Sequence, residues 1–267
     1  MPSWPHATNR HRTNGHTLDL YAFPPIAAIL DAAYSLLMGL SALLEPLAGS
    51  AAAAASVILI TLLVRAALVP AGIAQAKAEQ MRSRLAPKLR ELQRRHKRDP
   101  ERLQRETMKL YADEKASPFA GCLPMLAQAP VVAIVYALFL HTAIAGHANA
   151  LLAEQLFGVP LGASLVGAVA TGAATASTWA VFAGVLAVIV VVAELTRRAF
   201  RPPVGGSEDA SPLAGAGIAR VAGLLQFTTA VFALFVPLAE ALYLAVTVSW
   251  TLAQRLVLRR FYPLATA

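Results

Sequence analysis

The sequence predicts an all-α integral membrane protein with a five-helix transmembrane core, a cytoplasmic helical hairpin and an N-terminal interfacial helix. Of its 267 residues, 57% are apolar and only 14% are charged, against about 25% charged in ordinary globular domains. The charge is also concentrated, because residues 77–115 hold more than half of the 23 Lys and Arg. Several apolar tracts reach about 20 residues, the length that crosses a bilayer as a helix. Lipid is therefore the expected solvent of most of the chain.

Residues 1–50 are predicted to form an extracytoplasmic N-terminal segment with one apolar helix. Pro24 to Leu47 is long enough to span a membrane. Asp31, Ser35 and Glu45 fall near one face of this helix, which favours a position in the membrane interface. A sixth span is the alternative.

The five spans follow from the apolar tracts and from the places where they end. They are residues 51–75, 117–144, 179–196 and, as two helices that separate at Pro237, residues 221–258. The segments around them are the hairpin at 76–116, an extracytoplasmic connection at 145–178, a cytoplasmic loop at 197–220 and a cytoplasmic tail at 259–267. Lys and Arg mark the cytoplasmic side of a membrane protein. Five spans place all three basic segments on that side.

The segment at 76–116 has the pattern of two amphipathic helices. Asp99-Pro100 between them predicts an N-cap followed by a proline at the first helical position, and Pro87 is expected to kink the first arm. The apolar stripe of the first arm is Met81, Leu85, Leu89, Leu92 and His96, and that of the second is Leu103, Thr107, Leu110 and Tyr111.

Two connections have a turn-rich composition. In the outer one, Phe157-Gly158-Val159-Pro160 predicts a turn, and in the inner one, Pro202 to Pro212 predicts a flexible loop.

The net charge of +8 does not indicate nucleic-acid binding, because the basic block lies between spans. The single cysteine, Cys122, excludes an intramolecular disulfide and a Cys-based metal cluster. No cofactor is expected.

Arg65 is the most informative residue, because it is the charge inside the first span. It lies about ten residues, or roughly 15 Å of helix, from the basic flank. A mid-span Arg costs at least about 2.5–3.5 kcal/mol on insertion scales and usually faces a partner or a water-filled cavity. One interpretation is a hydrated, positively charged recess within the bundle. The other is a buried ion pair with Glu194 or Glu240.

Other polar residues within the spans could line such a recess. Thr61 precedes Arg65 by one helical turn and shares its face. Each alone is a weak signal, since polar residues in spans often bond a neighbouring helix or their own backbone. The further candidates are Gln128, Gln226, Trp250 and Gln254.

The stretch from Leu59 to Leu138 resembles the YidC family of membrane protein insertases, which is related to mitochondrial oxidase-assembly and chloroplast Albino proteins. Ile60 to Pro70, ITLLVRAALVP, is similar to the arginine-bearing helix of that family, and Leu85 to Val131 is similar to its hairpin and second span. A weaker similarity continues through the C-terminal run, which contains Pro237, Leu242, Tyr243, Trp250, Gln254, Leu258, Arg259 and Arg260.

The resemblance implies a bacterial plasma-membrane, multi-pass insertase that works without nucleotide and without a covalent reaction. Its expected partners are nascent membrane proteins, the ribosome and the lipid bilayer, and whether it acts alone or beside the Sec translocon stays open. No phosphate-binding glycine loop is present. Taken together with the polar residues of the spans, the resemblance predicts a substrate groove that contains Arg65, Thr61, Gln128, Glu194, Gln226, Tyr243, Trp250 and Gln254.

Three positions depart from the family pattern, and two other functions compete with insertion. Leu244 stands where the family often has an aromatic residue, Glu194 stands where it often has Gln, and Glu240 is an unusual charge in a span. A secondary transporter would show internal repeats and broken helices, which are not evident in the sequence. A non-catalytic membrane assembly factor, with the hairpin as its docking arm, is the third possibility.

Overall fold

A computed structural model of the chain describes residues 23–114, 116–117, 123–144, 146–200 and 224–264, with only the backbone of residues 123–128. Helices dominate these residues, and the strands in them are four two-residue segments in two small hairpins. The predicted all-α membrane fold is confirmed. The predicted inner loop at Pro202–Pro212 and the cysteine Cys122 lie outside the described residues.

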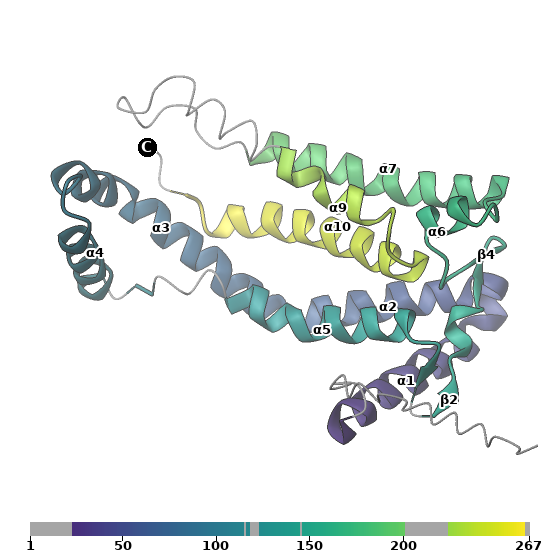
Figure 1. Cartoon of the computed structure of the whole chain (residues 1–267). Helices are drawn as coiled ribbons and strands as arrows, with labels where there is room; N and C mark the ends of the chain where they lie inside the picture. The colour runs from purple at the N-terminus through teal and green to yellow at the C-terminus, as the bar shows by residue number, and fades with distance from the viewer. Residues whose placement is uncertain (1–22, 115, 118–122, 145, 201–223, 265–267) are drawn as a thin grey trace, which may run out of the picture.

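Four helices lie side by side and form the bundle (Figure 1). They are α2 (Ala52–Ala67), α5 (Leu123–Leu140), α7 (Ala176–Ala199) and α10 (Leu238–Phe261). α10 is central, because it packs against the other three. By length and composition, the helical segments able to cross a membrane are Pro24–Ala67, Ala176–Ala199 and Leu238–Phe261, and Ala129–Leu140 is a shorter apolar helix.

The predicted fourth span differs from a regular helix in its described part. It contains a 3-10 turn, η4 (Leu225–Phe227), a short helix, α9 (Thr228–Phe232), and a non-helical link to Pro237. Pro237 precedes the first residue of α10 with φ −53° and ψ 151°, an extended conformation that a proline readily adopts. The number of spans therefore stays a prediction, although the break at this proline is present.

Helix α1 (Pro24–Ala48) starts at a proline pair and ends at Gly49, whose φ of 52° favours glycine. It packs mainly against α2. Leu30 and Leu37 are buried there, whereas Leu43 and Leu47 on the other side are exposed. An apolar exposed face fits contact with lipid in either predicted position, interfacial or spanning.

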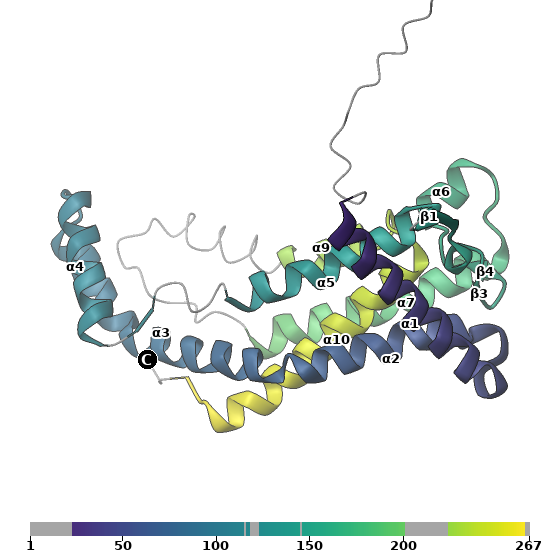
Figure 2. The ribbon, with the colours of Figure 1, turned by 90° about the horizontal axis from the view of Figure 1, so that it is seen from below.

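Helix α3 (Val69–Arg95) follows α2 after the single residue Leu68 and extends beyond the bundle to the helix α4 (Pro100–Asp113) (Figures 1 and 2). Asp99 caps α4 as predicted, since its Oδ1 accepts a hydrogen bond of 2.9 Å from the backbone N–H of Arg102. The predicted stripe residues are buried or partly buried, whereas the charged residues between them, except Glu106, are exposed, and Leu85 is 2% exposed. An ion pair between Lys88 and Glu114 also joins the arms.

The opposite end of the bundle carries a folded connection between α5 and α7. Its elements are β1 (Ala143–Ile144), β2 (His147–Ala148), η3 (Ala150–Leu152), β3 (Gln155–Leu156), β4 (Val159–Pro160) and α6 (Leu165–Ala170). The predicted turn is present at Phe157-Gly158, which have φ of 50° and 81°, and Val159 and Pro160 pair as a strand.

This connection provides hydrogen-bond partners for backbone groups at the ends of two helices in the bundle. The amide of Leu238 donates to the carbonyl of Ala163 at 2.8 Å and so supplies a partner at the start of α10. Asn149 donates to the carbonyls of Leu138 and His141 at the end of α5, at 2.5 and 2.9 Å. The main buried apolar cluster gathers around these contacts.

Candidate functional site: a polar crevice beside α10

Arg65 lies in the last turn of α2 and is partly buried. The hydroxyl of Tyr243, a residue only 1% exposed on α10, interacts with its guanidinium group. The Nε of Arg65 is buried, and no hydrogen-bond partner for it exists among the described residues. The guanidinium therefore faces α10 with part of its hydrogen-bonding capacity unused.

A crevice runs from Arg65 along α3 and α10. It contains a cavity of about 80 Å³, several times the roughly 10–15 Å³ that one water needs. Polar and apolar residues from two walls line this cavity. The α2–α3 wall contributes Arg65, Leu68, Ala71, Gly72, Gln75, Ala76 and Glu79, and the other wall contributes Thr251, Gln254, Arg255, Leu258, Arg259, Tyr262 and Leu264.

The two walls approach each other closely at Gly72. A Cβ built on this glycine would lie 1.9 Å from Nε2 of Gln254, so the absence of a side chain leaves room for that amide. Trp250 fixes the other side of the amide, because its Nε1 donates to Oε1 of Gln254 at 3.1 Å. Gln254 Nε2 itself is buried without a partner in the described chain.

The basic end of the crevice is held by contacts among three helices. Nη2 of Arg255 on α10 donates to Oε1 of Glu79 on α3 at 3.1 Å. Phe200, directly after α7, has its ring centroid 4.7 Å from Cζ of Arg255 and 4.1 Å from Cζ of Arg259. Cation–π geometry of this kind orients both guanidinium groups.

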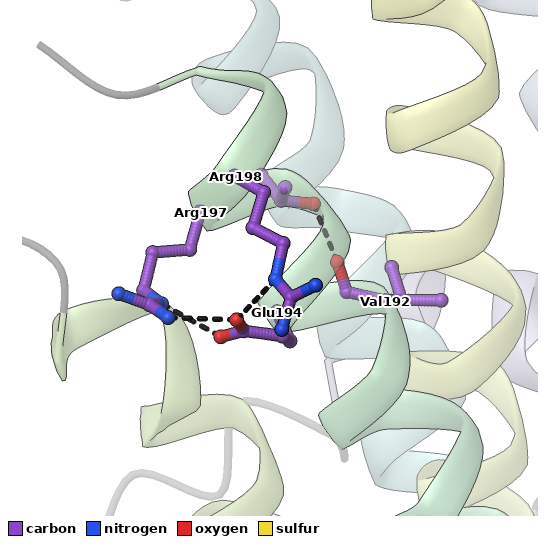
Figure 3. Close-up of polar contacts among 5 residues, drawn as sticks. Val192, Glu194, Arg197 and Arg198 are labelled. Atoms are coloured by element: carbon purple, nitrogen blue, oxygen red, sulfur yellow. Dashed lines mark hydrogen bonds and ion pairs between the residues drawn. The ribbon is translucent and has the colours of Figure 1, made fainter.

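The ion-pair interpretation of Arg65 is wrong for the residues described. Glu194 instead binds two arginines of its own helix, at 2.7 Å to Arg197 and 2.6 Å to Arg198 (Figure 3). Glu240 is 3% exposed, and its Oε2 accepts no hydrogen bond from the described residues. The reason is local: arginines three and four residues after Glu194 on one helix compete better than a residue on a distant helix.

The remaining predicted site residues do not all reach the crevice. Thr61 is buried, and its hydroxyl donates to the carbonyl of Val57 at 2.6 Å, so its own helix satisfies it. Gln226 lies exposed on η4. Gln128 lies on α5, and its side chain is outside the described part. Of the predicted set, Arg65 and Gln254 line the cavity, Tyr243 interacts with Arg65, and Trp250 donates a hydrogen bond to Gln254.

Sequence reasoning missed the lower part of the crevice. None of Gln75, Glu79, Arg255 and Arg259 was predicted as a site residue, although Gln75 and Arg255 fell inside predicted spans. A signal was available, because Gln75 and Glu79 continue the helix face of Arg65 in steps of three and four residues. The boundary at residue 75 assigned Glu79 to the hairpin, whereas in the structure the helix continues past it after a single break at Leu68.

Residues 44–265 match the model of a protein family described as 60Kd inner membrane protein. Known bacterial proteins named membrane protein insertase YidC are also similar to the chain. The one from Clostridium perfringens is 34% identical over 115 residues, covering 43% of this chain and 48% of its own. Those from Aquifex aeolicus and Pasteurella multocida are 38% and 40% identical over 87 and 93 residues, covering 33% and 35% of this chain and 17% of each relative. The chain thus matches about half or less of the length of these relatives.

Proposed function

The chain belongs to the 60Kd inner membrane protein family of YidC-type membrane proteins, and from this premise we propose that it inserts hydrophobic helices of other proteins into the bilayer. The observation that carries the proposal is a partly buried arginine that faces a polar crevice inside a membrane bundle. No carboxylate among the described residues neutralises Arg65. An acidic residue of an incoming client is a suitable partner for it.

The proposed mechanism divides the client between two environments. Its apolar segment partitions into lipid, while its polar flank enters a hydrated groove between α2–α3 and α10. Water in the groove shortens the path through hydrocarbon, where a charged side chain costs at least about 2.5–3.5 kcal/mol. The step needs neither nucleotide nor a covalent intermediate. Support comes from the four predicted groove residues that lie together and from the cavity between the walls.

The decisive experiment uses proteoliposomes that contain only this protein and a single-span client with Asp or Glu in its translocated segment. Arg65→Ala should lower insertion about tenfold, equivalent to about 1.4 kcal/mol of lost stabilisation. Arg65→Lys should keep much of the activity, because the positive charge remains. A client without acidic residues is the matched control and should lose less than about threefold. Equal loss for both clients would contradict the proposed role of the arginine.

The same assay separates the rival functions. A non-catalytic assembly factor would give no insertion without further proteins, and a secondary transporter would give solute uptake in its place. Insertion by the purified protein alone would exclude the first of these. Partners such as the ribosome and the Sec translocon belong to the proposal, and stimulation by added ribosomes carrying nascent client would support the former.

We also propose that the α3–α4 hairpin and the C-terminus are cytoplasmic, as the distribution of Lys and Arg suggests. After Cys122→Ser, single cysteines at Ser83 and Thr266 should be shielded from an impermeant thiol reagent in intact cells. A cysteine at Ala153, exposed in the folded connection at the opposite end, should react. Labelling of Ser83→Cys from outside would refute this orientation.

A further inference from the structure

The crevice concentrates hydrogen-bond donors that lack acceptors. Four of its buried side-chain nitrogens have no partner among the described residues: Nε of Arg65, Arg255 and Arg259, and Nε2 of Gln254. All four atoms are N–H donors. Buried donors are normally paired, because an unpaired one costs about 1–3 kcal/mol. Because the four side chains line one cavity, that cavity suits a group rich in hydrogen-bond acceptors.

The charge of the site defines that group further. At the basic end, the one carboxylate among the described residues that line the cavity is Glu79, and it already accepts a hydrogen bond from Nη2 of Arg255. Arg259 forms no ion pair within the described chain, and the ring of Phe200 holds its guanidinium in place. The pocket thus carries excess positive charge with planar, oriented donors. Guanidinium groups of this kind suit phosphate, whose oxygens accept paired N–H donors.

The position of the site along α10 favours a ligand that belongs to the membrane surface. Arg259 lies in the last turn of this candidate span. Large apolar side chains on the same stretch point outward, since Leu256, Val257 and Phe261 are 48%, 54% and 72% exposed. These side chains suit contact with acyl chains, while the arginines lie where a span ends and headgroups begin.

We propose that the basic end of the crevice, formed by Gln254, Arg255 and Arg259, binds a phosphate group. The cavity of about 80 Å³ has room for more than one water. The phosphate of a phospholipid headgroup and free inorganic phosphate present the same acceptors, and the experiment separates these two sources. The site is distinct in role from Arg65, and the proposal does not depend on insertase activity.

The test uses the full-length protein in detergent micelles and measures retained lipid by native mass spectrometry and stability by thermal unfolding. Phosphatidylglycerol is the lipid probe, a phosphate-free diacylglycerol is its control, and inorganic phosphate against chloride at equal ionic strength is the second arm. The variants are Arg259→Gln and Arg259→Lys, with Arg260→Gln as the matched control. Arg260 is adjacent, carries the same charge, is exposed and does not line the cavity.

The wild-type protein should retain phosphatidylglycerol over diacylglycerol by at least about fivefold. Arg259→Gln should lower this retention by about fivefold, Arg259→Lys by less, and Arg260→Gln by under about twofold.

If Arg259-dependent stabilisation appears with inorganic phosphate, the source is free phosphate; if it appears only with the phospholipid, the source is the headgroup. Should Arg259→Gln fail to fold, stabilisation of the wild type by phosphatidylglycerol over diacylglycerol supports the site. Equal retention by the Arg259 and Arg260 variants, or stabilisation of the wild type by neither phosphate source, would overturn it.

Discussion

The two halves of α10 show opposite ways of burying a membrane helix. In its first half, Leu238 to Tyr243 are all at most 8% exposed, and the apolar cluster and the connection after α5 surround them. In its second half, from Val246 to Phe261, the one side chain with comparable burial is Leu252. The first half is a packed anchor, whereas the second is one wall of a polar crevice.

Most of the buried polar atoms of α10 that lack a hydrogen-bond partner among the described residues lie in its second half, although Oε2 of Glu240 in the first half lacks one too. Unpaired buried groups would destabilise a small domain by several kcal/mol if nothing else compensated. The packed half supplies that compensation through close side-chain contacts, which stabilise helix association in lipid. Under our proposals, the open half offers these donors to a client or to a lipid phosphate.

The largest expected effect comes from matched leucines on the two halves. Leu238→Ala, at a residue 0% exposed, should lower the free energy of unfolding by about 2–4 kcal/mol through lost packing and the remaining cavity. Leu256→Ala, at a residue 48% exposed, should change it by less than about 1 kcal/mol. Unfolding in mixed micelles by increasing SDS measures both. Similar losses for the two variants would show that the halves are equally packed.

The sequence predicted the helices better than it predicted the crevice. Apolar length, the cap at Asp99 and the break at Pro237 are local signals, because each depends on neighbouring residues. The arginines that pair with Glu194 are also close to it in the sequence. From the sequence, Arg65 was nevertheless considered as its partner, because charge alone does not distinguish one arginine from another. Glu79 and Arg255 are 176 residues apart in the sequence, and their contact depends on how α3 packs against α10. No local pattern in one sequence predicts such packing.

A smaller effect is expected at Gly72, where the walls of the open half meet. Gly72→Ala should destabilise the protein by up to about 1 kcal/mol, because the new Cβ forces the end of the Gln254 side chain away from Trp250, while the helix propensity of Ala offsets part of the loss. In the double variant with Gln254→Ala the loss should shrink, since the clash is gone and Ala favours a helix by about 1 kcal/mol over Gly. A double-mutant cycle measures the coupling. Strict additivity would mean that the walls do not touch here.

The Gly72 prediction has a control at an exposed helical glycine elsewhere in the bundle. Gly184 lies in α7, and a Cβ there would meet nothing within 4 Å. Gly184→Ala should therefore raise stability by the helix-propensity gain alone, up to about 1 kcal/mol. A loss at both glycines would point to a general effect of methyl groups on the bundle and not to contact with Gln254.

The smallest expected effect concerns the outer end, where α1 meets the connection after α5. His147 Nε2 lies 3.0 Å from Oδ1 of Asp31, and the rings of His147 and Tyr34 are 4.9 Å apart. The hydroxyl of Tyr34 also accepts from the amide of Ala150 at 3.4 Å. These contacts attach α1 to β2, and both members of the ion pair are about half exposed.

The hydrogen bond to Asp31 raises the pKa of His147 above its ordinary value of about 6.5. A raised pKa in the folded state means that folding favours the protonated imidazole. The stabilisation from this pair is therefore fully present below about pH 6.5 and disappears as the pH rises through the raised value. The melting temperature of the wild type should fall slightly across this window, and those of His147→Gln and Asp31→Asn should not follow it. If Asp31→Asn kept the wild-type slope, the dependence would belong to another group, and the attachment of α1 would not be controlled by pH.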